Sequence, residues 1–446
     1  MSLLQLTSLR RAAPLLLALA APLASMAAQD SLSPPDGVRV GIDYRPGVRP
    51  TVVVLPGRGL DSARAILTRD LDYSDRFDVI ALGPQDSSAA AANAGGRTVN
   101  YGLFRTLGAE FAVELAPDGV GTAVRVHDIT TGTVRHEERF ALPAAFDVNF
   151  RMAVHRASDE VVRWITGTPG AAASQLLFLV DRKLYRVDSD GAGTSQLSAP
   201  GEEILSPVWS PDGSRIAFTR FGAGIGSIMV QTLASGQRIT VSGTTSALNI
   251  TPAFSPDGRT LAFARSSEDG TDIYAADVVQ NCCVQRLTVG RYSDNLSPTY
   301  SPDGRRLAFV SSRAGLPQVY VMAADGTDQE LLAPFDFGAT GNSSAPEWSP
   351  DGASVIFHRD INRSQQVFVL DVATRRIRQL SSAGRNEDPT WAPDGRHIAF
   401  VSDRSGRKQL WVIDMLTGRI RQLTFVGQVR LPAWSRRLAG PVTSTN

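Results

Sequence analysis

The last two thirds of the chain repeat one order of polar and apolar positions. Each copy has a proline, any residue and an aromatic residue, then Ser-Pro-Asp-Gly, then a short apolar run. The copies begin at Pro207, Pro252, Pro298, Pro346, Pro389 and Pro432. The fifth has alanine in place of serine, and the sixth lacks Pro-Asp-Gly. The aromatic residues recur every 43 to 48 residues, the length of a four-stranded propeller blade, so six copies predict six blades.

The Pro-Asp-Gly segment predicts a tight turn between two antiparallel strands. Proline fixes φ at the first corner, aspartate bonds to its own backbone, and glycine supplies a left-handed residue. The apolar triplets after these turns are expected to be buried strands, at 216–218, 261–263, 307–309, 355–357 and 398–400. Each blade needs two further strands, which segments such as 318–322 and 330–332 provide.

The phase of the repeat predicts how the ring closes. The propeller region opens with three strand patterns, at 175–180, 184–187 and 195–198, and no Pro-x-aromatic phrase precedes them. The segment 431–435 is, by contrast, a single strand with no following turn. We therefore expect the C-terminal strand to complete the first blade.

A pattern of mixed helices and strands precedes the propeller. Strands are predicted at 51–55, 77–82, 110–115, 122–129 and 133–142, and helices around 60–71, 101–107 and 149–165. The segment 83–96 is rich in Ser, Ala and Gly and is expected to be a mobile linker. The predicted fold is thus a small α/β domain over 51–168, an all-β six-bladed propeller over 172–436, and a C-terminal tail over 437–446.

The first 28 residues have the pattern of a cleaved signal peptide. Arg10 and Arg11 precede an apolar run over 12–24, which ends in small residues up to Ala27 and Ala28. The run is too short and too rich in proline to span a membrane, and Ala-Ala-Pro after the arginines favours the general export route over the twin-arginine route. No later stretch is apolar for ~20 residues, so we expect a soluble exported protein that starts with an extended segment, 29–50.

Charge and cysteine content exclude several classes of function. Without residues 1–28 the chain has 43 basic and 44 acidic residues, so nothing indicates a surface for nucleic acid or an anionic membrane. The only cysteines, Cys282 and Cys283, are neighbours in a predicted turn. A disulfide between adjacent residues closes a strained ring, and no nearby His or further Cys completes a metal site. We expect no structural disulfide and interpret the pair as incidental.

The sequence lacks the motifs of propeller peptidases and of metalloenzymes. A peptidase of this type needs an α/β-hydrolase domain with a Gly-x-Ser-x-Gly motif, which the chain does not contain. The histidines are scattered without metal-ligand spacing, at His127, His136, His155, His358 and His397. The enzymatic alternative is a lyase or hydrolase for a small or oligomeric substrate. There, Asp294, Glu387 and Asp388 would act as acid or base beside a metal in the channel.

Protein binding fits these features best. The loops that lead into the inner strands converge on the propeller axis and form a broad, rigid surface, which we call the rim. Its candidate binding residues are Leu248, Asn249, Thr251, Asp294, Asn295, Ser297, Asn342, Ser343, Asn386, Glu387 and Asp388.

Taken together, the two parts resemble the TolB family, the periplasmic propeller proteins of the Tol-Pal system in Gram-negative bacteria. The resemblance covers nearly the whole chain after the signal peptide. It is carried by Val-Arg-Val-Gly-Ile-Asp at 38–43, by 52–56, by 155–161 with Ile-Thr-Gly at 165–167, and by 431–435. Two places depart from the family pattern: the strand at 111–115 is more acidic, and Leu248 stands where many members have a polar residue.

The resemblance implies a set of partners. The rim would bind the peptidoglycan-associated lipoprotein Pal, and the segment 29–43 would engage TolA through Val38, Arg39, Val40, Ile42 and Asp43. Other outer-membrane proteins are further candidate partners. The implied role is support of outer-membrane integrity and cell division, by a monomer without catalytic activity, cofactor or metal.

Overall fold

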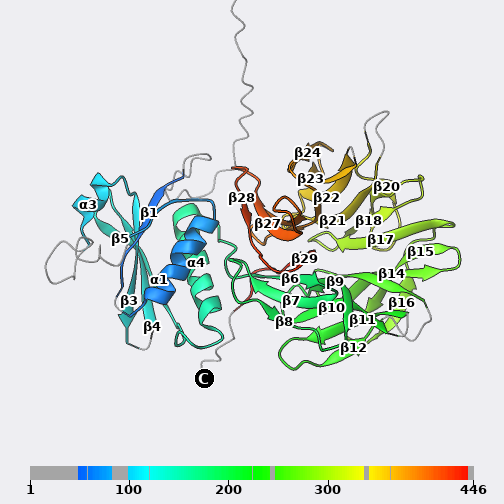
Figure 1. The fold of residues 1–446 in the computed structure, drawn as a ribbon, viewed down its shortest axis with the longest axis horizontal. Coiled ribbons are helices and arrows are strands. Elements are labelled where there is room, and N and C mark those ends of the chain that lie inside the picture. The colour runs from blue at the N-terminus through cyan, green and yellow to red at the C-terminus, as the bar shows by residue number, and fades with distance from the viewer. Residues whose placement is uncertain are drawn as a thin grey trace, which may run out of the picture. The chain divides into compact units, whose positions relative to one another are not determined.

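The computed structural model describes residues 49–57, 59–82, 99–119, 121–222, 225–241, 247–335, 341–361 and 363–439. They form an α/β domain and a β-propeller (Figure 1). The predicted signal peptide, the segment 29–43 and the linker 83–96 lie outside the described residues. Within the described ranges, no helix is long and apolar enough to cross a membrane.

A five-stranded sheet in the order β2-β1-β3-β4-β5 organises the first domain. Its strands are β1 (Thr51–Val54), β2 (Asp78–Ile80), β3 (Phe111–Asp118), β4 (Gly121–Asp128) and β5 (Thr133–Phe140). β1 is parallel to β2 and β3, whereas β3, β4 and β5 are antiparallel neighbours. Parallel strands need a crossover, and α1 (Asp61–Tyr73) provides it between β1 and β2.

Alternation along β1 divides the core of this domain in two. Val52 and Val54 pack against α1 and α4 (Phe150–Thr166), whereas Val53 packs on the other face with Phe104 of α3 (Tyr101–Thr106). The predicted apolar stripe of α4 is buried throughout, at Phe150, Val154, Ala157, Val161 and Ile165. The helix ends at Gly167, whose φ of 81° reverses the chain.

The described residues of the propeller form six blades of four antiparallel strands. From inner to outer strand, the first three blades are β29 (Val429–Trp434), β6 (Gln175–Val180), β7 (Lys183–Asp188), β8 (Ser195–Gln196); β9 (Glu203–Trp209), β10 (Arg215–Gly222), β11 (Ile225–Thr232), β12 (Arg238–Thr240); and β13 (Asn249–Phe254), β14 (Thr260–Ser267), β15 (Gly270–Asp277), β16 (Cys282–Arg286). The other three are β17 (Ser293–Tyr300), β18 (Arg306–Ser311), β19 (Gln318–Ala323), β20 (Glu330–Leu331); β21 (Ser343–Trp348), β22 (Ser354–Ile361), β23 (Ser364–Asp371), β24 (Ile377–Gln379); and β25 (Asn386–Trp391), β26 (His397–Ser402), β27 (Gln409–Asp414), β28 (Ile420–Gln422). Blades three and four share one sheet because β15 also pairs in parallel with β17.

The predicted turns have the expected chemistry. The glycines of the five Pro-Asp-Gly turns all have φ between 66° and 73°, at Gly213, Gly258, Gly304, Gly352 and Gly395. In the first turn, the backbone N–H of Ser214 donates to Asp212 Oδ1 across 3.1 Å. The turn residues thus adopt the conformations for which their side chains are suited.

The predicted ring closure is confirmed. β29 pairs antiparallel with β6, so that Val429 faces Val180 and Trp434 faces Leu176. Apolar side chains of neighbouring blades then pack against each other, as Leu177 of β6 does in one cluster with Ile216 of β10. The last strand therefore belongs to the first blade.

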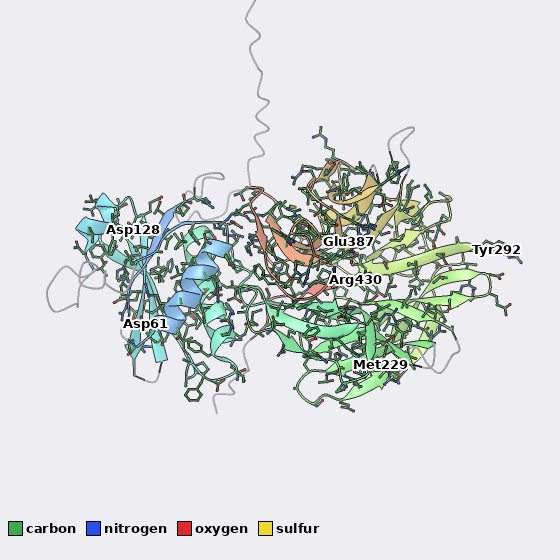
Figure 2. All side chains as sticks on the ribbon, viewed as in Figure 1. Asp61, Asp128, Met229, Tyr292, Glu387 and Arg430 are labelled. Carbon is green, nitrogen blue, oxygen red and sulfur yellow. A yellow bond between two sulfur atoms is a disulfide. The ribbon has the colours of Figure 1, made fainter. Side chains whose placement is uncertain are left out.

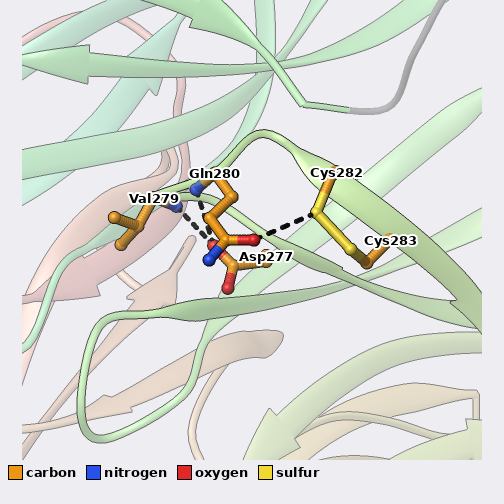
Figure 3. The surroundings of a disulfide bond; sticks show 5 residues. All are labelled: Asp277, Val279, Gln280, Cys282 and Cys283. Atoms are coloured by element: carbon orange, nitrogen blue, oxygen red, sulfur yellow. Dashed lines mark hydrogen bonds between the residues drawn. A yellow bond between two sulfur atoms is a disulfide. The ribbon is translucent and has the colours of Figure 1, made fainter.

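No structural disulfide is expected from the sequence, yet Cys282 and Cys283 are bonded to each other (Figure 3). The pair begins β16 instead of lying in the preceding turn. Asn281 and Cys283 have positive φ, 52° and 63°, and the β15–β16 register shifts at this point. Neighbouring side chains in a regular strand point to opposite faces, so this local irregularity is what brings the two sulfur atoms together.

Candidate functional site

Each inner strand has one residue in a left-handed conformation, directly before the proline of the repeated phrase. Their φ values lie between 48° and 52°, at Ser206, Thr251, Ser297, Ala345, Asp388 and Leu431. The strand register shifts at the same place in all six blades. Such a conformation costs a non-glycine residue about 1–3 kcal/mol, so its recurrence in all six blades indicates that the bulge is a regular part of the blade structure. These bulges were not predicted from the sequence, although all six fall on the residue before the proline of the repeated phrase.

The six bulges surround a central cavity of about 310 Å³. The left-handed residues, the prolines after them and the aromatic residues of the phrase all line it. Glu347, Asp388 and Arg436 add charged groups to the lining. The cavity therefore combines apolar walls with a few polar groups, the usual composition of a binding site.

Burial raises the pKa of both acidic groups of the cavity. Burial raises the pKa of Glu347 to about 7, although its carboxylate accepts a hydrogen bond from the backbone N–H of Trp391 across 3.1 Å. Burial also raises the pKa of Asp388, which accepts from the backbone N–H of Leu431. His358 Nδ1 accepts from the backbone N–H of Asp388 across 3.1 Å, and burial lowers the pKa of this imidazole. The charge of the cavity thus depends on pH.

Five predicted rim residues are buried, and four of them, Asn249, Asn295, Ser343 and Asn386, share one arrangement of hydrogen bonds. Each accepts a hydrogen bond of 2.9–3.0 Å from an arginine on or just after the second strand of its own blade, respectively Arg265, Arg313, Arg359 and Arg404. The three asparagines also donate to the third strand of the preceding blade, at Gly226 O, Asp272 Oδ1 and Gln366 Oε1. These residues join neighbouring blades beneath the rim.

The other predicted rim residues, except Glu387, reach the surface. Leu248 and Asp294 are exposed, and each directly precedes a buried asparagine, as strand alternation requires. Thr251, Ser297, Asn342 and Asp388 are half-buried. Glu387 is buried and forms ion pairs with Lys408 and Arg385. Figure 2 labels Glu387 on β25 and Arg430 on β29, the inner strands of two adjacent blades.

The three acids of the enzymatic alternative do not share one cavity. Asp388 lines the central cavity, whereas Asp294 and Glu387 do not. Glu387 is, in addition, engaged by Lys408. An acid and a base need to face the same substrate, so this arrangement gives the alternative no support.

Two of the five histidines, His155 and His397, lie in an ionic junction between the α/β domain and the propeller. His155 of α4 bonds to Asp70 of α1 across 2.8 Å and lies 3.8 Å and 3.9 Å from Asp188 and Asp190 of the first blade. Burial opposes a charged imidazole, but these carboxylates outweigh it and raise the pKa of His155 to about 10.

Asp75 is the second centre of this junction. Its side chain is fully buried, and its backbone φ is 55°. It accepts from His397 Nε2 across 3.2 Å and pairs with Arg419 and Arg421 at 3.0 Å and 3.3 Å. Arg396 donates to the backbone oxygen of Asp75 across 2.8 Å. No short sequence motif predicts the role of Asp75, because its partners Arg396 and His397 are more than 300 residues away.

Two groups in the junction resemble metal sites, Asp70–His155–Asp190 and Asp75–His397–Asp414, with candidate ligand atoms within 4.8 Å of one another. Arginine side chains already contact Asp190, Asp75 and Asp414. A metal ion would have to share these carboxylates with guanidinium cations, which repel it. We therefore assign both groups to the ionic junction.

Comparisons with known proteins agree with this architecture. The chain is 34% identical over 194 residues to the Tol-Pal system protein TolB of Methylococcus capsulatus, a match of 41% of this chain and 44% of that protein. It is 32% identical over 198 residues to the TolB of Azoarcus sp., covering 42% of this chain and 44% of that one. The matched region thus spans less than half the length of these relatives.

A solved structure and a family match extend the comparison. The crystal structure of TolB from Acinetobacter baumannii has the same fold, with a TM-score of 0.75 and 24% identity over 88% of this chain and 98% of that one. Residues 162–336 and 336–439 match the family described as TolB beta propeller domain. The match includes all six blades, so the chain belongs to the TolB β-propeller family.

Proposed function

We propose that this protein is a periplasmic, non-enzymatic component of the Tol-Pal envelope system that binds Pal through its rim. The observation that carries the proposal is the ring of six bulged inner strands around one cavity. Closure through β29 makes this ring rigid, which lowers the entropy cost of binding. Membership of the TolB family supports the identity of the partner.

The rim is available to a partner because the α/β domain contacts other parts of the blades. Described contacts with that domain include those of Asp188, Asp190, Arg396, His397 and Arg419. These residues lie at or near the strand ends opposite the rim. A protein that covers Leu248, Asp294 and the cavity would therefore leave the ionic junction in place.

The rim is tested by changing its exposed residues. Asp294→Arg and Leu248→Glu are expected to weaken binding of the soluble Pal domain at least tenfold, about 1.4 kcal/mol, in isothermal titration calorimetry. Arg259→Glu and Arg305→Glu, exposed beside the Pro-Asp-Gly turns at the other end of the blades, are matched controls and should leave affinity within twofold. Equal losses from both pairs, with unchanged melting temperatures, would show that Pal binds elsewhere.

We further propose that the segment 29–43 binds TolA, through Val38, Arg39, Val40, Ile42 and Asp43. The proposal is supported by the family resemblance of this segment. Deletion of 29–43 should abolish TolA binding and spare Pal binding, both measured on the same purified protein. Retention of TolA binding by the deletion variant would refute this assignment.

Acting as a monomer between Pal and TolA, the protein would support outer-membrane integrity and cell division. Other outer-membrane proteins are further candidate partners.

A further inference from the structure

The disulfide between Cys282 and Cys283 occupies an unusual place in the fold. It joins adjacent residues at the start of β16, the outermost strand of the third blade. Cys283 is exposed and Cys282 is half-buried, while the four residues around them, Asn281, Val284, Gln285 and Arg286, are exposed as well. The bond is therefore accessible from solvent.

This disulfide contributes little to holding the fold together. A disulfide stabilises a protein mainly by closing a loop in the unfolded chain, and the effect grows with loop length. Here the sequence separation is one residue, so the unfolded chain is barely constrained. Stability does not explain why the bond is present.

Other contacts hold the same segment in place. The carboxylate of Asp277 accepts from the backbone N–H groups of Val279 and Gln280, both across 2.8 Å, and so shapes the turn before the pair (Figure 3). After the pair, Arg286 forms an ion pair with Asp272 on β15. Opening the disulfide would thus leave β16 attached to its blade.

We propose that Cys282 and Cys283 form a reversible two-electron redox site that exchanges with the dithiol of a protein oxidoreductase. The exposed apolar side chains of Val279 and Val284, 63% and 41% exposed, flank the pair and give a protein partner a surface to contact. The site lies on an outer strand, whereas the rim is built from inner strands, so it is separate from the proposed Pal surface.

The exchange proceeds in two balanced steps. A thiolate of the donor attacks the exposed Cys283 Sγ, the Cys282–Cys283 bond breaks, and Cys282 leaves as a thiolate that takes up a proton. The second donor thiolate then attacks its partner sulfur in the mixed disulfide and releases Cys283, which is also protonated. The donor ends as a disulfide, and the protein gains two electrons and two protons.

The adjacency of the two cysteines predicts which reductants succeed. After the first step, Cys282 lies beside the mixed disulfide and can attack it, which restores the original bond. A dithiol competes with this reversal because its second thiol is already held in the mixed disulfide. A monothiol needs a second molecule to complete the reduction. Dithiothreitol should therefore reduce the site at a much lower concentration than glutathione.

The test is a titration of the full-length folded protein, purified without reductant, with dithiothreitol or glutathione. Free thiols are trapped with a maleimide and counted by mass spectrometry. We expect no label before reduction, two labels after treatment with dithiothreitol, and loss of both on reoxidation. The dithiol form should also bind phenylarsine oxide, which bridges neighbouring thiols. The double variant Cys282→Ser/Cys283→Ser, which contains no cysteine, is the control for labelling.

Three outcomes would overturn the proposal. The first is labelling of the untreated protein, which would mean that the bond does not form. The second is resistance of the folded protein to excess dithiothreitol when the guanidinium-unfolded protein is reduced. The third is a large drop in melting temperature of the double serine variant, which would make the bond a structural one.

Discussion

Trp434 Nε1 donates a hydrogen bond to Ser174 Oγ across 2.8 Å, although 260 residues separate the two. The neighbouring Ser435 Oγ accepts from the backbone N–H of Gln175 across 2.9 Å. These contacts join the end of the last strand to the start of the first blade, beside the β29–β6 ladder. The ring is therefore closed by side chains as well as by backbone pairing.

Trp434→Ala is expected to lower the free energy of unfolding by about 3–5 kcal/mol, because a large buried side chain is removed from the seam of the ring. Denaturant unfolding of both proteins measures the difference. Trp434→Phe, which keeps most of the volume but not the hydrogen bond to Ser174, should lose less. A Trp434→Ala variant as stable as the parent would contradict the closure described here.

Asn386→Leu should destabilise the propeller by about 2–4 kcal/mol. The substitution removes the hydrogen bond that Arg404 donates to Asn386 and the one that Gln366 accepts from it, so Arg404 keeps Ser402 and the Gln366 amide oxygen keeps Ser381 as buried partners. Thermal unfolding measures the effect, and Asp294→Ala, at an exposed rim position, should change stability by less than about 0.5 kcal/mol. Equal stability of the two variants would mean that the buried asparagines do not join the blades.

The ionic junction predicts a dependence of stability on pH. The pKa of His155 is raised from 6.5 to about 10 in the folded protein, so its contribution is complete below pH 6.5 and is lost as pH rises toward 10. His155→Gln should therefore cost more than about 1 kcal/mol at pH 6.5, and its difference from the parent should shrink toward pH 10. Melting temperatures of both proteins across this range measure it. A difference that does not change with pH would show that His155 is uncharged in the folded state.

At low pH, protonation of Asp188 is expected to weaken the same junction. Burial would raise the pKa of Asp188, but the nearby imidazole of His155 and hydrogen bonds from Gln175 and Arg151 outweigh it and lower the pKa from 3.8 to about 2. Stability from this group is present above pH 3.8 and is lost as pH falls to about 2. Asp188→Asn should make the melting temperature less sensitive to pH in that window, and an unchanged profile would argue against an ionised Asp188.

Export predicts a defined N-terminus. Protein recovered from the periplasm should begin at Ala28 or Gln29, because the apolar run of the predicted signal peptide ends in small residues there. Intact-mass measurement decides this. An intact Met1 on the recovered protein would contradict cleavage.

The sequence by itself determined the blade repeat, the turn chemistry and the closure of the ring. These features are local, since proline, aspartate and glycine each fix the backbone within a few residues, and the repeat period counts the blades. Even closure could be predicted, because the first blade lacks an inner strand and the chain ends with an unpaired one. The strands of the α/β domain likewise follow from their apolar runs.

Only the tertiary structure decided which polar residues are exposed and which are paired. Leu248 and Asn249 are neighbours where β13 begins, yet Asn249 is buried against Arg265 of the next strand whereas Leu248 is exposed. Asp75 and His397 are 322 residues apart in the sequence, so no local pattern could reveal their contact. The disulfide required two left-handed residues and a register shift, and these depend on how β16 pairs with β15. Side-chain environment is set by contacts between distant segments, whereas the backbone pattern is set by near neighbours.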